Sequence, residues 1–255
     1  MAIDEVFKNP TVKQVVFQIT FPNLFYIENK IGEFQQKIMN EFPESVLLYR
    51  RQFAWADVGP EVKLTEIESK LEKEPTGQKI WQFKSPKNFQ LDVLSSSLGI
   101  ISNYHKTYRM ENGDKFRDVI EFVVSNFLQV VPIPIISRIG LRYIDECPIF
   151  SKDNDTFKAY YNSVFPIDRF NLADAEEMDF KTVVKKEDYY LRYVESLRKV
   201  KDQYKLILDF DGFKVNVNPQ DFLKVTDDLH TIIFNEYEKT ITELVKEYMR
   251  KAKEG

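Results

Sequence analysis

The chain has 255 residues, with 36 Lys and Arg against 40 Asp and Glu, which gives a formal net charge of −4. Hydrophobic residues make up 43% and charged residues 30% of the chain, while Gly (8) and Pro (11) are scarce. These proportions are typical of a folded globular protein and exclude a disordered, collagen-like or low-complexity chain. The 21 Phe and 13 Tyr residues predict an aromatic core.

The first half of the chain predicts strands and helices in alternation. A run of β-branched and aromatic residues at 12–21 predicts a strand, and apolar residues at helical spacing predict a helix over 24–42. Residues 62–71 fit either a helix or a strand. The other expected elements are strands over 46–58, 80–83, 89–96 and 135–144, and a helix over 115–130.

The second half predicts a connection, further strands and a long helix. Residues 151–185 are polar and weakly periodic, and we expect a connecting insertion there. Strands are predicted over 189–197 and 204–217. Asn218 is expected to cap the last helix, with Pro219 at its first position. Apolar spacing then predicts one helix of roughly thirty residues, about 45 Å long at about 1.5 Å per residue.

Strands outnumber the helices that could cross between them, so most neighbouring strands should pair antiparallel. The predicted fold class is α+β, with a mainly antiparallel sheet and helices packed on one side. The order strand, helix, strands, helix, strand predicts a ferredoxin-like N-terminal half over residues 1–150. After the insertion at 151–185, residues 186–255 should add strands and the long helix, packed on the first half as one unit.

The chain has few residues suited to disulfides or metal centres. Cys147 is the one cysteine, and His105 and His230 are the two histidines, which excludes an internal disulfide and a Cys-rich zinc site. We expect Cys147 to be a buried structural thiol and the histidines to lie on the surface or on a helix face. We expect no cofactor.

The N-terminus has neither a basic region nor an apolar region, so we expect no secretory signal and a cytoplasmic location. The apolar run at 130–136 contains two prolines and is too short to cross a bilayer. The mild acidity makes nucleic-acid binding by bulk charge unfavourable. The expected partner is another protein or a second copy of the chain, with no membrane.

The stretch Ser-Arg-Ile-Gly-Leu-Arg-Tyr-Ile-Asp at residues 137–145 resembles a signature of a sporadically distributed family of uncharacterised prokaryotic proteins of about this length. That family tends to open with Asn-Pro before a Val-rich strand, as residues 9–21 do, and residues 81–83 and 104–116 match a later aromatic segment. The chain departs from the family where a Trp usually follows the tyrosine, because Tyr104 is followed by His-Lys-Thr-Tyr. The resemblance implies one unit of typical length and no particular activity.

Arg138 and Arg142 lie on one predicted strand with Gly140 between them. Side chains alternate along a strand, so these three residues share a face, with the two guanidinium groups about 13 Å apart along the strand. Such a pair can bind a carboxylate or a phosphate-bearing partner. We favour the simpler interpretation, in which both arginines are solvated or pair with carboxylates of a neighbouring strand.

Asp209 and Asp211 also share one face of a strand, a spacing that can hold Mg²⁺ together with phosphate oxygens. Asp211-Gly212 is equally a common hairpin turn signal, and we favour the turn. In a third, purely structural arrangement, the two aspartates pair across strands with Arg138 and Arg142. These four residues are the candidate binding site, and no residue is predicted to be catalytic or to bind a metal.

Other motifs are weaker. Asp57 followed by Glu61 and Lys63 resembles the acidic set of some nucleases, but the tight turn at residues 59–60 makes that interpretation unfavourable. Walker, dinucleotide-binding, zinc-protease and serine-hydrolase motifs are absent from the sequence.

The leading prediction is a cytoplasmic, non-enzymatic binding or adaptor protein that acts through a protein–protein surface, with either another protein or a second copy of the chain as its partner. The alternative is a phosphate-handling or nucleic-acid-processing enzyme that uses Arg138, Arg142, Asp209 and Asp211. A second alternative is a carrier that encloses a small apolar ligand between the long helix and the sheet.

Overall fold

In the computed structural model of the protein, nine strands of the described residues form one antiparallel sheet in the order β2-β3-β4-β5-β1-β6-β9-β8-β7. The structure describes residues 5–51, 77–103, 107–108 and 115–251. The expected strand over 46–58 extends beyond these ranges, and residues 62–71 and the Asp57 motif lie wholly outside them. The α+β class and the antiparallel sheet are confirmed.

The first half of the sheet begins at the centre and returns to it. Strand β1 lies at the centre of the sheet, and β2, β3, β4 and β5 then step from the edge back to β1. Helix α1 separates β1 from β2, and α3 follows β5. The elements are β1 (Val12–Thr20), α1 (Ile27–Ile38), β2 (Glu44–Arg51), β3 (Gly77–Lys84), β4 (Phe89–Leu94), β5 (Ser97–Ser102) and α3 (Phe116–Val130).

The second half repeats this path with one strand fewer. Strand β6 pairs with β1, and β7, β8 and β9 step from the opposite edge back to β6 before α5 crosses the sheet. The elements are β6 (Ile136–Pro148), α4 (Asn154–Tyr160), the 3-10 turn η1 (Leu172–Asp174), β7 (Met178–Lys186), β8 (Tyr189–Val200), β9 (Gln203–Val217), the 3-10 turn η2 (Pro219–Asp221), α5 (Phe222–Thr240) and α6 (Glu243–Arg250). Although no sequence repeat is evident, the two halves share one topology about the β1–β6 pair.

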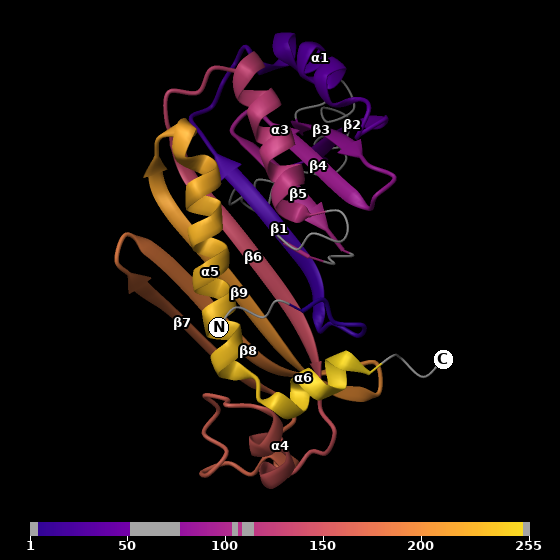
Figure 1. Cartoon of the computed structure of the whole chain (residues 1–255), viewed down its shortest axis with the longest axis vertical. Helices are drawn as coiled ribbons and strands as arrows, with labels where there is room; N and C mark the ends of the chain where they lie inside the picture. The colour runs from indigo at the N-terminus through magenta and orange to yellow at the C-terminus, as the bar shows by residue number, and fades with distance from the viewer. Residues whose placement is uncertain (1–4, 52–76, 104–106, 109–114, 252–255) are drawn as a thin grey trace, which may run out of the picture.

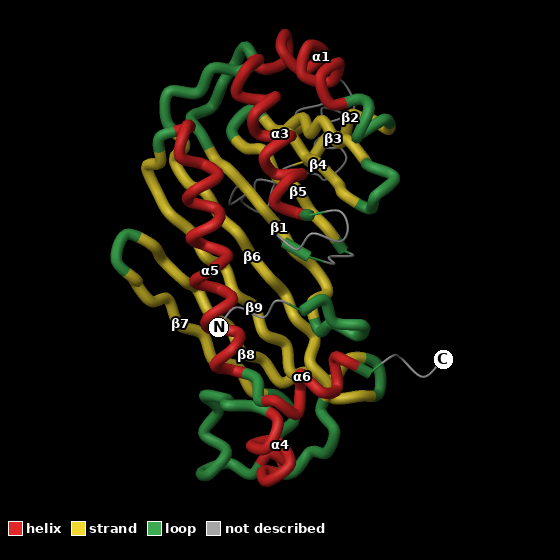
Figure 2. Tube along the Cα trace, in the orientation of Figure 1, coloured by secondary structure: helices red, strands yellow, loops and turns green. Residues whose placement is uncertain are grey.

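Helices α1, α3 and α5 lie on the same face of the sheet, and α4 and α6 lie beyond its lower end (Figures 1 and 2). Alternate residues of β1, Val15, Phe17 and Ile19, point into this helical layer and are fully buried. Phe34 of α1 and Phe127 of α3 pack edge to face there, with ring centroids 5.2 Å apart. Each buried side chain of this size stabilises the fold by about 1.5–3 kcal/mol, so the amphipathic faces of the helices are sufficient to hold the layers together.

The ferredoxin-like N-terminal half is not what the structure contains, because the described residues between α1 and α3 include four strands rather than two. One of them, β5, is additional to the expected elements.

The single helix of roughly thirty residues is also wrong, because α5 ends at Thr240 and α6 begins at Glu243. Between them Ile241 forms a β-bridge with Tyr161, and the amide of Thr242 donates to the carbonyl of Tyr160 (3.0 Å). Backbone pairing with the insertion thus replaces helical hydrogen bonds at this break. Asn218 does cap the 3-10 turn that leads into α5, and Pro219 is its first residue, as predicted.

The insertion expected over 151–185 ends earlier, because its last residues form the edge strand β7. Asp153 caps α4 by accepting from the amide of Thr156 (2.8 Å). The hairpin turn at Asp211-Gly212 is wrong, since β9 runs through both residues without a break. In the described residues, no helix is both long and apolar enough to span a membrane.

Candidate functional site

The structure brings the four predicted residues together on one face of the sheet. We call this the open face, the side of the sheet opposite α1, α3 and α5. Arg142 of β6 lies directly opposite Asp211 of β9, and Arg138 and Asp209 lie on the same face nearby. Because β9 is one continuous strand, Asp209 and Asp211 point to the same side, as the strand interpretation required.

Arg142 forms a two-point ion pair with Asp209. Its Nε donates to Oδ1 and its Nη2 to Oδ2, both at 2.7 Å. Arg192 of β8 approaches the same carboxylate, with Nη1 3.6 Å from Oδ2. The hydrogen bonds to Asp209 raise the pKa of Arg142, so this guanidinium group stays charged. Asp209 is only 8% exposed, which strengthens the pair relative to one in open water.

Arg138 lies flat across its own strand to reach Asp211. Its Nη2 donates to Oδ1 of Asp211 at 2.7 Å, and its Cζ lies 4.7 Å above the centre of the Phe213 ring. A Cβ on Gly140 would lie 2.8 Å from that Cζ, so only a glycine permits this path. The ring of Tyr190 stacks on Phe213 at 5.1 Å, which extends the layer towards β8.

Together these residues form a charge network of three arginines and two aspartates. The third arrangement considered from the sequence, cross-strand pairing of the arginines with the aspartates, is the one observed. Each aspartate is engaged by a guanidinium group, so a phosphate or a cation would have to displace an existing partner. In the described residues, no group of three His, Cys, Asp or Glu side chains is arranged to hold a metal ion.

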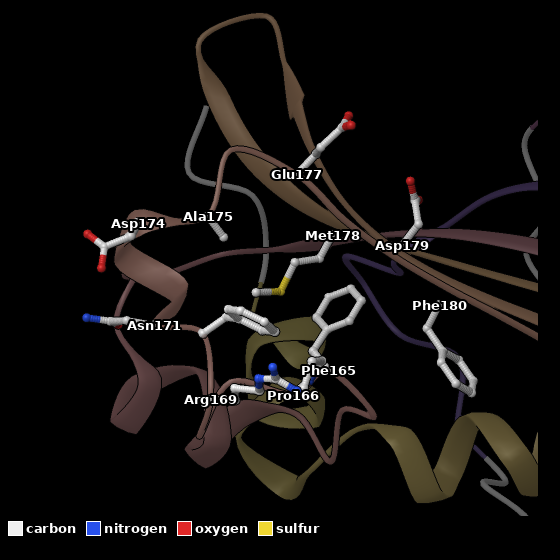
Figure 3. Close-up of a pocket in the computed structure, with 11 residues that line it drawn as sticks. Phe165, Pro166, Arg169, Asn171, Asp174, Ala175, Glu177, Met178, Asp179 and Phe180 are labelled. Atoms are coloured by element: carbon white, nitrogen blue, oxygen red, sulfur yellow. The ribbon is translucent and has the colours of Figure 1, made fainter.

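A second site, which the sequence did not reveal, lies where the insertion meets the edge strand β7. It is a pocket of about 720 Å³. In Figure 3 the side chain of Met178 points into it towards aromatic rings, whereas the carboxylates of Glu177 and Asp179 point away. The lining residues are Phe165, Pro166, Arg169, Phe170, Asn171, Asp174, Ala175, Glu177, Met178, Asp179 and Phe180.

The pocket has an apolar wall that is open to solvent. Phe165 is buried, but Phe170 is 53% and Phe180 is 37% exposed, which is unusual for large aromatic side chains. Arg169 lies over the Phe170 ring at 5.0 Å. The signal in the sequence was the alternation of Met178, Phe180 and Thr182, which the lysines around it obscured.

The C-terminal half also buries two carboxyl groups beneath its helices. Asp145 of β6 and Glu195 of β8 lie on either side of Leu208 of β9. The hydroxyl of Thr11 donates to Oδ1 of Asp145 (2.7 Å), and burial raises the pKa of Asp145 to about 7. Glu195 accepts from the hydroxyl of Tyr193 (2.8 Å) and from Ser163, and burial raises its pKa as well.

Cys147 and His230 have structural surroundings. Cys147 is fully buried, as predicted, and its burial raises the pKa of the thiol well above the usual range. His230 of α5 stacks on Tyr108 with ring centroids 3.9 Å apart, which places it on a helix face as expected. His105 lies outside the described residues.

Comparisons of the chain with family models, with curated proteins and with solved structures give no match. The family resemblance based on residues 137–145 therefore stays a prediction. Function has to be argued from the geometry of the two sites.

Proposed function

We propose that this chain is a non-enzymatic binding protein that holds a segment of another protein at the pocket and along the adjoining strand β7. A cytoplasmic location is part of the proposal, since the buried thiol of Cys147 requires no oxidising compartment. The proposal keeps the leading prediction from the sequence and places the protein–protein surface at the lower end of the second half.

The observation that carries the proposal is the continuity of the pocket with a sheet edge. In the described part of the chain, no strand pairs with β7 on its outer side, so its outward backbone groups are available. Met178 and Phe180 belong both to β7 and to the pocket wall. An extended segment that adds to β7 therefore passes the pocket and can place one large apolar side chain in it.

The charge network on the open face makes the enzyme alternative less favourable than a binding protein. Arg138 and Arg142 already bind Asp211 and Asp209 within the chain, so an enzyme that used these four groups would first have to break both ion pairs. A ligand carrier would need a cavity between α5 and the sheet, whereas the pocket lies at the sheet edge. We therefore place both alternatives behind the binding protein.

The test is a selection of random displayed peptides against the full chain. Selected peptides should share one large apolar residue within an extended, alternating pattern. Phe170→Ala should weaken their binding by roughly thirtyfold or more, because a truncated aromatic anchor is costly at an interface. Phe25→Ala is the matched control, since Phe25 is 90% exposed and lies between β1 and α1, in the other half of the fold. Equal affinity of both variants, or no enriched peptide, would contradict the proposal.

A further inference from the structure

Strand β7 has opposite charges at its two ends on the open face. At its beginning, Glu177 and Asp179 share a single cation, Arg198, which donates to them at 2.6 Å and 2.7 Å. At its end, Lys185 is exposed and forms no ion pair with any described residue, and the same holds for Lys181. On the open face, Asp179 at the beginning of β7 and Glu177 before it therefore have an excess negative charge, whereas Lys181 and Lys185 of β7, before Glu187 and Asp188 of the turn, have an excess positive charge.

The apolar residues of β7 are exposed along the same edge. Val183 is 54%, Val184 37% and Phe180 37% exposed. Edge strands of monomeric proteins are normally kept short, charged or covered, and exposed valines beside an unpaired edge favour pairing with another strand.

We propose that the segment bound at β7 is the β7 strand of a second copy of this chain, which gives a two-fold symmetric dimer with a continuous sheet. The inference rests on the proposed function and names the partner of that site. Two copies of β7 pair antiparallel about an axis perpendicular to the sheet, so residues opposite each other share a face.

Among the residues of β7 itself, a register centred on Thr182 pairs both the charges and the apolar residues. With Thr182 opposite the partner's Thr182, Asp179 lies opposite the partner's Lys185, which supplies a second cation for the carboxylate of Asp179. Glu177 and the partner's Glu187 are opposite each other in this register, but both lie beyond the ends of β7. On the helical face, Phe180 lies opposite the partner's Val184. Oppositely charged and apolar cross-strand neighbours are the pairs that stabilise a sheet.

The same strand is not complementary in neighbouring registers. A shift of the two-fold axis to Lys181 places this lysine against itself, and a shift to Val183 places Lys181 against the partner's Lys185. Like charges directly opposite each other are destabilising, and of these three registers only the one centred on Thr182 has no like-charge pair among the residues of β7. The other sheet edge, β2, is followed directly by residues 52–76, which the structure does not describe, and we assign no partner to it.

A pair of charge-reversal variants tests the dimer. Lys185→Glu places Asp179 against the partner's glutamate, and Asp179→Lys places a lysine against the partner's Lys185. Each variant alone should dissociate at least tenfold more readily than the wild type in sedimentation velocity runs at low salt. A mixture of the two should restore the dimer, because each then presents the charge that the other lacks.

Lys199→Glu is the matched control, since Lys199 is an exposed lysine of β8 beyond the first residue of β7, and its dimer should be as stable as that of the wild type. A monomeric wild type, or dimers in both single variants, would overturn the inference. A monomeric wild type whose Phe170→Ala variant still loses bound peptides would refute the dimer alone and leave the proposed function intact.

Discussion

The N-terminal half of the sheet encloses a layer of aliphatic and aromatic side chains, whereas the C-terminal half buries carboxyl groups in the same layer. Among the described residues, the buried acids Asp145, Glu195 and Asp209 all belong to the second half, while the buried polar residues of the first half are neutral. The open faces differ in the same way. Gln82 and Gln90 donate to Asp92 in the first half, and arginines pair with Asp209 and Asp211 in the second.

This difference shows that one topology can serve two purposes. The first half depends on close packing of rings and therefore on shape. The second half buries ionisable side chains, which makes its stability sensitive to pH and salt. The pocket and the free edge of β7 also lie in the second half, so binding and charge are concentrated there.

The largest expected effect is a pH dependence that comes from the second half. Burial raises the pKa of Asp145 from 3.8 to about 7, so between these values the folded chain keeps a proton that the unfolded chain releases. The free energy of unfolding should therefore fall as the pH rises from about 4 to about 7, by about 2–4 kcal/mol, and level off above that range. The raised pKa of Glu195 acts in the same direction.

Asp145→Asn should remove most of this fall, because the amide oxygen can still accept from Thr11 and carries no charge. Urea unfolding at pH 5 and pH 8 measures it: the variant should be more stable than the wild type at pH 8 and close to it at pH 5. If the free energy of unfolding falls by the same amount between pH 5 and pH 8 in both proteins, Asp145 does not cause the pH dependence.

A smaller effect is expected on the open face. Asp209→Asn leaves the guanidinium group of Arg142 without its charged partner, and it should lower the free energy of unfolding by about 2 kcal/mol. Asp92→Asn is the equivalent change in the first half. This variant keeps an acceptor for Gln82 and Gln90, so it should lower the free energy of unfolding by less than about 0.5 kcal/mol. If urea unfolding gives the same loss of unfolding free energy for both variants, the proposed difference between the two halves is wrong.

The smallest expected effect is a difference in stability between alanine substitutions at two glycines of the open face. Gly140→Ala should displace Arg138 and cost about 1 kcal/mol, whereas Gly99→Ala, whose nearest neighbour is the carbonyl oxygen of Phe17 at 3.7 Å, should be neutral or slightly stabilising. The cost at Gly140 should disappear when Arg138→Ala is already present. Thermal unfolding of the four variants measures this, and a cost that persists without Arg138 would point to the backbone instead.

The sequence predicted elements whose periodicity is local. The spans of β1, α3 and β6 were close to correct because their apolar residues follow a single period without interruption. Strand β7 was missed because lysines surround its alternating residues and because an edge strand has little need for a buried face. The break between α5 and α6 depends on pairing with Tyr161, a contact distant in sequence that periodicity does not reveal.

The candidate site was predictable in its residues and not in its geometry. That Arg138 and Arg142 share a face follows from alternation alone, but their pairing with Asp211 and Asp209 depends on the register of β6 and β9. Gly212 was misleading, since its place in Asp-Gly suggested a turn. In the structure a Cβ there would lie 3.1 Å from Ile233 of α5, so the glycine allows this helix to approach the sheet.

The central position of β1 has a consequence for the newly made chain. Strand β1 precedes every other element, yet one of its two neighbours, β6, follows the entire first half. Until β6 has left the ribosome, the first half can complete its own layer only with β1 as an outer strand, exposing amide and carbonyl groups that are later paired at the seam. Nascent chains in which β6 has not yet left the ribosome should accordingly bind chaperones or aggregate, and the released full-length chain should not.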